Sequence, residues 1–140
     1  MFAMRKILLV LIGLAAALAG LLLWGFLEAR ADPIVRRVEI AMPDLPAGTP
    51  PLRVLLLSDV HAGNLAVPPA RLTRIVAQIN ALQPDLVLIA GDFLPGHAAV
   101  DAATATARLA PLKGLRARLG VVAVPGNHDH WTGLDAVPRA

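Results

Sequence analysis

The sequence predicts an α/β protein preceded by an apolar amino-terminal helix. An uncharged apolar stretch long enough to span a membrane, Ile7–Leu27, lies near the start of the chain. Three short apolar runs, each typical of a β-strand, follow at regular distances and alternate with helical patterns. Each run ends in polar side chains that can bind metal ions, and sites form at such strand ends in open α/β sheets.

The composition limits the class of protein. At 140 residues the chain has room for one domain at most, and 56% hydrophobic content is too high for an ordinary soluble one. Cysteine is absent, so oxygen and imidazole groups must hold any metal ion. Three of the 13 basic and one of the 10 acidic residues precede Asp32, which leaves ten basic and nine acidic residues in the rest of the chain. This near balance, without runs of like charge, gives no indication of nucleic-acid binding.

The apolar stretch predicts a membrane anchor. As a helix at ~1.5 Å per residue, Ile7–Leu27 spans the roughly 30 Å hydrocarbon core. A cleavable signal peptide is the alternative, because Ala17–Ala19 and Ala29–Ala31 match a small-x-small cleavage pattern, but cleavable apolar regions usually run only ~7–15 residues. Arg5 and Lys6 favour an inside start. We therefore expect a single-pass cell-membrane protein with its domain on the outer, periplasmic or extracellular, side.

The chain divides into three predicted parts. Residues 1–31 form the anchor, residues 32–51 a strand with a proline-rich connector, and residues 52–140 the α/β domain. The strand is expected over Ile34–Met42, where apolar residues alternate loosely, and five prolines and glycines between 43 and 51 follow it.

The domain begins with the first strand and its crossover helix. Leu52–Leu57 is a nearly continuous apolar run, typical of a strand covered on both faces. Pro68 and Pro69 mark a helix start. The apolar residues that follow recur at helical spacing and predict a core-facing stripe: Leu72, Ile75, Val76, Ile79 and Leu82.

The same order then repeats. Asp85–Ala90 is a second apolar strand, Ala98–Leu109 is predicted as a helix, and Leu112–Leu119 as a short amphipathic turn. Val121–Val124 is expected as a third, buried strand. Successive polar ends lie about 33 residues apart, the spacing of right-handed βαβ crossovers, so the strands should be parallel.

Parallel strands bring the polar ends to one edge of the sheet. Asp59 and His61 are two residues apart, so an extended backbone would point both toward one metal ion. Asp92 follows a glycine and offers two oxygens that can bridge two ions, while Asn127 offers a neutral oxygen. This mixture of ligands suits Mn, Fe, Zn or Co.

Two such ions would activate a water molecule and clamp a phosphoryl group. His128 could then protonate the leaving oxygen or stabilise charge on the phosphoryl group, with Asp129 holding its ring. Taken alone, Gly126–Asp129 favours a turn with a solvated histidine. However, three strand ends in this chain carry residues that can bind metal ions, and together they favour a metal site.

These residues, in order, resemble a known family. Asp59-x-His61, Gly91-Asp92 and Gly126–Asp129 are similar to the first three signature blocks of the calcineurin-like metallophosphoesterases, and the apolar helix resembles their bacterial membrane-associated branch. The resemblance covers roughly Leu52 to Trp131. It implies a four-layer αββα sandwich, of which this chain would supply the first half, and hydrolysis of phosphomonoesters or phosphodiesters at a dinuclear centre.

Residue by residue, the resemblance implies that Asp59 and His61 bind the first metal, Asp92 bridges, Asn127 binds the second, and His128 acts on the phosphoryl group. The family's later histidine blocks have no counterpart up to Ala140, so we expect residues 52–140 to be a truncated, poorly active domain. His97 and His130 do not match the motif. The anchor suggests lipid-linked phosphates or nucleotide-lipid pyrophosphates among the substrates, and the oligomeric state stays open. The alternative is a non-catalytic membrane protein that only binds metal or a partner.

Overall fold

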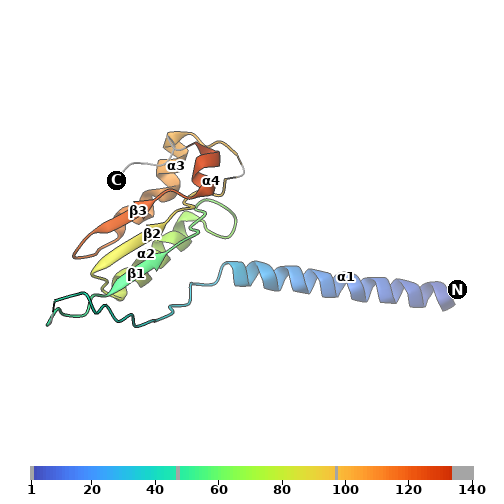
Figure 1. The fold of residues 1–140 in the computed structure, drawn as a ribbon. Helices are drawn as coiled ribbons and strands as arrows, with labels where there is room; N and C mark the ends of the chain where they lie inside the picture. The colour runs from blue at the N-terminus through green and yellow to red at the C-terminus, as the bar shows by residue number, and fades with distance from the viewer. Residues whose placement is uncertain (1, 47, 97, 134–140) are drawn as a thin grey trace. The chain divides into compact units, whose positions relative to one another are not determined.

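The computed structural model describes residues 2–46, 48–96 and 98–133 (Figure 1). The chain divides into two compact units, residues 1–31 and residues 32–140, and each is described by itself. The first contains helix α1. The second contains a three-stranded sheet with its connecting helices, consistent with the first half of a metallophosphoesterase-type α/β fold.

Helix α1, Phe2–Ala29, contains the predicted anchor and extends beyond it at both ends. Its side chains are exposed throughout, as expected of an isolated helix with apolar residues on every face. By length and composition it can cross a bilayer, although an amino-terminal signal sequence would meet the same criterion.

The strand predicted over Ile34–Met42 does not form. The described residues between α1 and the first strand belong to no ladder, and Ile34, Val38 and Ile40 are each about four-fifths exposed. A strand requires the backbone hydrogen bonds of a neighbour, and loose alternation in a sequence cannot supply that neighbour. The proline-rich connector after it is irregular, as predicted.

The parallel sheet is confirmed. Strands β1 (Val54–Leu57), β2 (Leu86–Ala90) and β3 (Val121–Val124) pair in the order β1-β2-β3, and all are parallel. Helix α2, Pro69–Ala81, makes the first crossover. Helix α3, Ala102–Leu109, and the short helix η1, Ala110–Gly114, make the second. The carboxyl ends of the strands therefore share one edge (Figure 1).

Local signals explain where the helices begin. Pro69 occupies the first turn of α2, where its missing N–H would have had no partner inside the helix. Helix α3 begins later than predicted because Asp101 caps it, and its carboxylate accepts a hydrogen bond from the Thr104 backbone N–H at 2.9 Å. That bond lowers the pKa of Asp101 below its usual value.

One face of the sheet forms the core. Four of the five residues of the predicted stripe are buried in α2, and the fifth, Leu82, follows the end of the helix and is partly exposed. The core that they join includes Val87 and Ile89 of β2, which are fully or almost fully buried. The opposite face is open among the described residues: Val54, Leu56, Val122 and Val124 are each about half exposed or more. The first strand, expected to be covered on both faces, is covered on one, the side of the two crossovers. The third strand is expected to be buried, but all four of its residues are exposed.

Candidate metal centre

The loops after β1 and β2 are bonded to each other beyond the ends of the strands. The backbone N–H of His61 donates to the carbonyl of Asp92, and that of Ala62 to the carbonyl of Phe93, both at 2.8 Å. The parallel pairing of the strands is thus continued by the loops. This places His61 directly beside Asp92, although 31 residues separate them in the sequence.

Three predicted ligands have a left-handed backbone. Four non-glycine residues in the described part of the chain have positive φ, and Asp59 (55°), His61 (44°) and Asp92 (55°) are three of them. Aspartate and histidine enter this region more readily than most residues, but it still costs of order 1–3 kcal/mol each. Such strain gathers at functional sites, and the sequence gives no direct sign of it.

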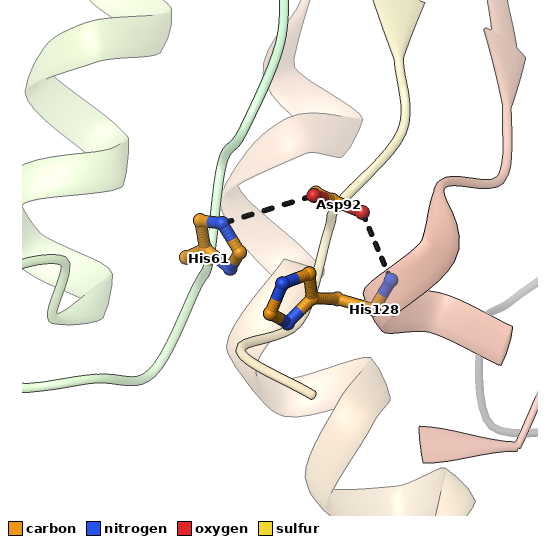
Figure 2. Close-up of side chains that lie close together, drawn as sticks. All are labelled: His61, Asp92 and His128. Carbon is orange, nitrogen blue, oxygen red and sulfur yellow. Dashed lines mark hydrogen bonds and ion pairs between the residues drawn. The ribbon is translucent and has the colours of Figure 1, made fainter. Parts of the chain in front are cut away.

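The closest group of potential ligands is His61, Asp92 and His128. One donor atom from each lies within 4.8 Å of the others, and Nε2 of His61 is 3.9 Å from Oδ2 of Asp92. Figure 2 shows the three side chains converging from the loops after β1 and β2 and from the start of helix α4, Asn127–Thr132. Metal–ligand bonds of about 2.0–2.2 Å place neighbouring donors roughly 3–4 Å apart, so the donor set fits one ion after small side-chain movements.

Asp59 is a further neighbour of His61. Its Oδ1 is 3.9 Å from Nε2 of His61, and its side chain is 67% exposed. The neighbouring Ser58 hydroxyl donates to its Oδ2. Nε2 of His61 therefore has one oxygen of each aspartate 3.9 Å away, and mixed carboxylate and imidazole donors of this kind suit a divalent transition-metal ion.

Asn127 is the first residue of helix α4, Asn127–Thr132, and is exposed. Its side chain makes no hydrogen bond with the described residues, so its assignment as the ligand of a second ion remains a prediction. His130 is also exposed, in the same helix, and His97 lies outside the described residues.

Asp92 occupies the centre of the arrangement. Its side chain is only 13% exposed, and Oδ1 accepts a hydrogen bond from the backbone N–H of His128 at 3.0 Å while Oδ2 faces His61 (Figure 2). Two glycines permit this approach. A Cβ on Gly91 would collide with the backbone of Gly126, and a Cβ on Gly126 would collide with Asp92 itself.

The ring of His128 is oriented by a backbone carbonyl. Its Nδ1 lies 3.1 Å from the carbonyl oxygen of Pro95, which can only accept, so Nδ1 carries the proton. In the neutral ring the lone pair is then on Nε2. The ring also packs edge-on against His61 and makes a tilted contact with Trp131, each with ring centroids 4.8 Å apart.

Asp129 has a different role from the predicted one. Instead of holding the His128 ring, its fully buried carboxylate accepts two backbone hydrogen bonds, from Leu94 N–H to Oδ1 at 3.2 Å and from Gly126 N–H to Oδ2 at 2.9 Å. The Pro95 carbonyl binds the ring nitrogen instead. The sequence suggested a contact between His128 and Asp129 because they are adjacent in the chain. In a helix, however, the side chains of adjacent residues point in different directions.

The sequence of the domain is similar to that of known proteins. Residues 52–139 match the model of the calcineurin-like phosphoesterase family. The chain is 37% identical over 108 residues to a transmembrane protein with metallophosphoesterase domain from Bos taurus, covering 77% of this chain and 23% of that protein. It is 31% identical over 126 residues to an uncharacterized metallophosphoesterase from Helicobacter pylori strain J99, covering 90% of this chain and 32% of that one.

A third relative has a stated activity. The UDP-2,3-diacylglucosamine pyrophosphatase LpxG of Chlamydia muridarum is 36% identical over 81 residues, covering 58% of this chain and 23% of that enzyme. The chain thus spans about a quarter to a third of the length of these curated relatives. No solved structure gives a significant match.

Proposed function

Because the chain belongs to the calcineurin-like metallophosphoesterase family, which is metal-dependent and acts on phosphate esters, we propose that it contributes a dinuclear centre to the hydrolysis of phosphomonoester or phosphodiester bonds. The observation that supports this most strongly is the position of Asp92, between His61 and the amino end of α4. A carboxylate with neighbours on both sides is suited to serve two ions.

Asp59, His61 and Asp92 would hold the first ion, and Asp92 and Asn127 the second. Divalent ions bound there supply an activated water molecule and charge stabilisation for the phosphoryl group. Cysteine-free, mixed oxygen and imidazole ligation favours Mn, Fe, Zn or Co.

The chain's own residues supply the proton chemistry. With Nδ1 of His128 donating to the Pro95 carbonyl, Nε2 is the nitrogen that can exchange a proton with a substrate oxygen. Contacts with the rings of Trp131 and His61 further restrict the orientation of the His128 ring. The imidazole is therefore oriented before a substrate arrives, which is the condition for efficient acid or base catalysis.

A lipid-linked substrate fits two observations. Helix α1 is long and apolar enough to hold the protein at a membrane, and one relative is named for acting on a nucleotide-linked lipid pyrophosphate. We propose that the substrate belongs to this class and that the domain lies on the outer side of the cell membrane.

A substrate panel tests the proposal. Full-length protein, purified in detergent, is incubated with Mn²⁺ and a phosphomonoester, a phosphodiester or UDP-2,3-diacylglucosamine, and His128→Ala and Asp85→Asn are compared. Loss of His128 should slow turnover by ~10²–10⁴-fold, whereas Asp85 lies at the opposite edge of the sheet and its loss should leave turnover unchanged. Metal binding without turnover of any substrate would instead favour the non-catalytic alternative.

A further inference from the structure

Asp129 is the one fully buried charged side chain among the described residues. An ionised carboxylate without partners is strongly unfavourable in such surroundings, so its hydrogen bonds account for its presence. Both of its oxygens accept from backbone N–H groups. One of these donors, Gly126, belongs to Asp129's own segment, and the other, Leu94, is 35 residues away and fully buried.

Each of the two segments supplies a carboxylate that accepts a backbone hydrogen bond from the other. The first loop, residues 91–96, supplies Asp92, whose Oδ1 accepts from His128 N–H in the second loop, residues 125–129. The second loop supplies Asp129, whose Oδ1 accepts from Leu94 N–H in the first. Each loop therefore holds the other through one side chain, and the glycine contacts between Gly91 and Gly126 allow the close approach.

From this arrangement we infer that Asp129 is a positioning residue, which sets the separation of Asp92 from Asn127 and His128 before any metal binds. We call its two bonds, to Leu94 and Gly126, the loop tie. The inference rests on the proposed function for its purpose, since the residues that it positions are the proposed ligands and acid. Asp129 acts through them, because its own oxygens are directed at buried backbone.

The loop tie explains how a centre assembled from separate loops can be preformed. A dinuclear site with a shared carboxylate requires that the loops on both sides of that carboxylate keep a fixed separation. Replacing a residue that orients ligands in this way typically lowers the metal affinity by about 10–100-fold. An asparagine at position 129 keeps the shape of the side chain but has only one acceptor oxygen. Its amide nitrogen, itself a donor, would therefore face one of the two backbone N–H groups.

Amide hydrogen exchange of the metal-free protein in detergent tests the inference. In the wild type, the amides of Leu94, Gly126 and His128 should be protected, and exchange at the rate of an unstructured loop would overturn the loop tie. In Asp129→Asn, His128 should exchange about tenfold faster or more, although its own acceptor, Asp92, is intact. Unchanged exchange at His128 would mean that Asp129 acts only locally.

Mn²⁺ titration by calorimetry supplies the second readout, with Thr132→Val as the matched control. Thr132 is buried in the same helix and its hydroxyl donates to the carbonyls of His128 and Asp129 within α4, so it stabilises the helix without joining the loops. Asp129→Asn should weaken Mn²⁺ binding by ~10–100-fold, and Thr132→Val should not. Equal weakening in both variants would reduce Asp129 to a general stability role. Because the exchange experiment needs neither metal nor substrate, its result stands whether or not the protein hydrolyses phosphate esters.

Discussion

His61 and Asp92 are joined twice: the backbone N–H of His61 donates to the Asp92 carbonyl at 2.8 Å, and its Nε2 lies 3.9 Å from the Asp92 Oδ2. The first contact belongs to the fold and the second to the proposed site. Since the backbone bond continues the pairing of β1 with β2, the register of the sheet determines which side chains meet at its edge. The position of the candidate metal centre therefore depends on the strand pairing.

Asp92 should matter more to metal binding than any other ligand. We expect Asp92→Asn to weaken Mn²⁺ binding at both sites, because it replaces the one carboxylate that both ions would share. The loss of affinity should be at least the ~10–100-fold that is typical when a residue that supports a ligand is replaced. Asn127→Ala should affect one site only. Calorimetric titration of both variants measures the difference, and equal losses in the two would show that Asp92 is not shared.

Gly96 should be required for the orientation of His128. A Cβ at position 96 would collide with the His128 imidazole, and Gly96 has a φ of +64°. Gly96→Ala should therefore lower kcat while leaving Mn²⁺ affinity nearly unchanged.

Gly120→Ala is the control for this prediction. Gly120 also has a positive φ, +93°, but a Cβ there meets nothing within 4 Å. Both variants carry the backbone penalty of roughly 1–2 kcal/mol for a left-handed alanine, so only the contact with His128 differs. Comparable kcat values in the two variants would argue against an oriented imidazole.

The acid stability of the domain should depend on Asp85, far from the metal centre. Its carboxylate accepts from the Arg53 backbone N–H at 2.9 Å and from the Arg118 Nε at 3.0 Å, and these bonds hold its pKa below the usual 3.8. A lowered folded-state pKa adds stability above the unfolded-state pKa, and that stability is lost as the pH falls through the folded value.

Asp85→Asn should therefore lower the Tm at pH 7 and have a smaller effect at an acid pH below the lowered folded-state pKa, where the wild-type carboxylate is itself protonated. Thermal unfolding at the two pH values measures this. A Tm difference that grows on acidification would contradict the assignment of these bonds.

Helix α1 should retain the protein in the membrane. Its apolar side chains extend over more than the hydrocarbon thickness, and we expect the protein to stay in the pellet after a carbonate wash. The appearance of a soluble processed form that starts near Asp32 would instead identify α1 as a cleaved signal sequence.

The sequence predicts those parts of the molecule that depend on local pattern. The apolar runs place all three strands, and the spacing of Leu72, Ile75 and Val76 identifies the buried face of α2. Parallel pairing then brings His61, Asp92 and His128 to the same edge of the sheet. A βαβαβ order with polar strand ends is thus enough to predict which residues share the edge.

Features that depend on distant contacts could not be read in the same way. The left-handed backbone of Asp59, His61 and Asp92 reflects how the loops fit together, and the bond from Leu94 to Asp129 joins segments without any shared motif. The missing strand over Ile34–Met42 has the same cause, since pairing depends on a neighbour that alternation does not reveal.

The central claim is that the carboxyl edge of this sheet holds two divalent ions that share Asp92. The most direct measurement is an anomalous difference map from crystals of the protein grown with Mn²⁺. We predict two peaks, ~3.5–4 Å apart, with an Asp92 oxygen bound to both, His61 on the first and Asn127 on the second. A map without a peak at this edge, or with a peak that Asp92 does not touch, would contradict it.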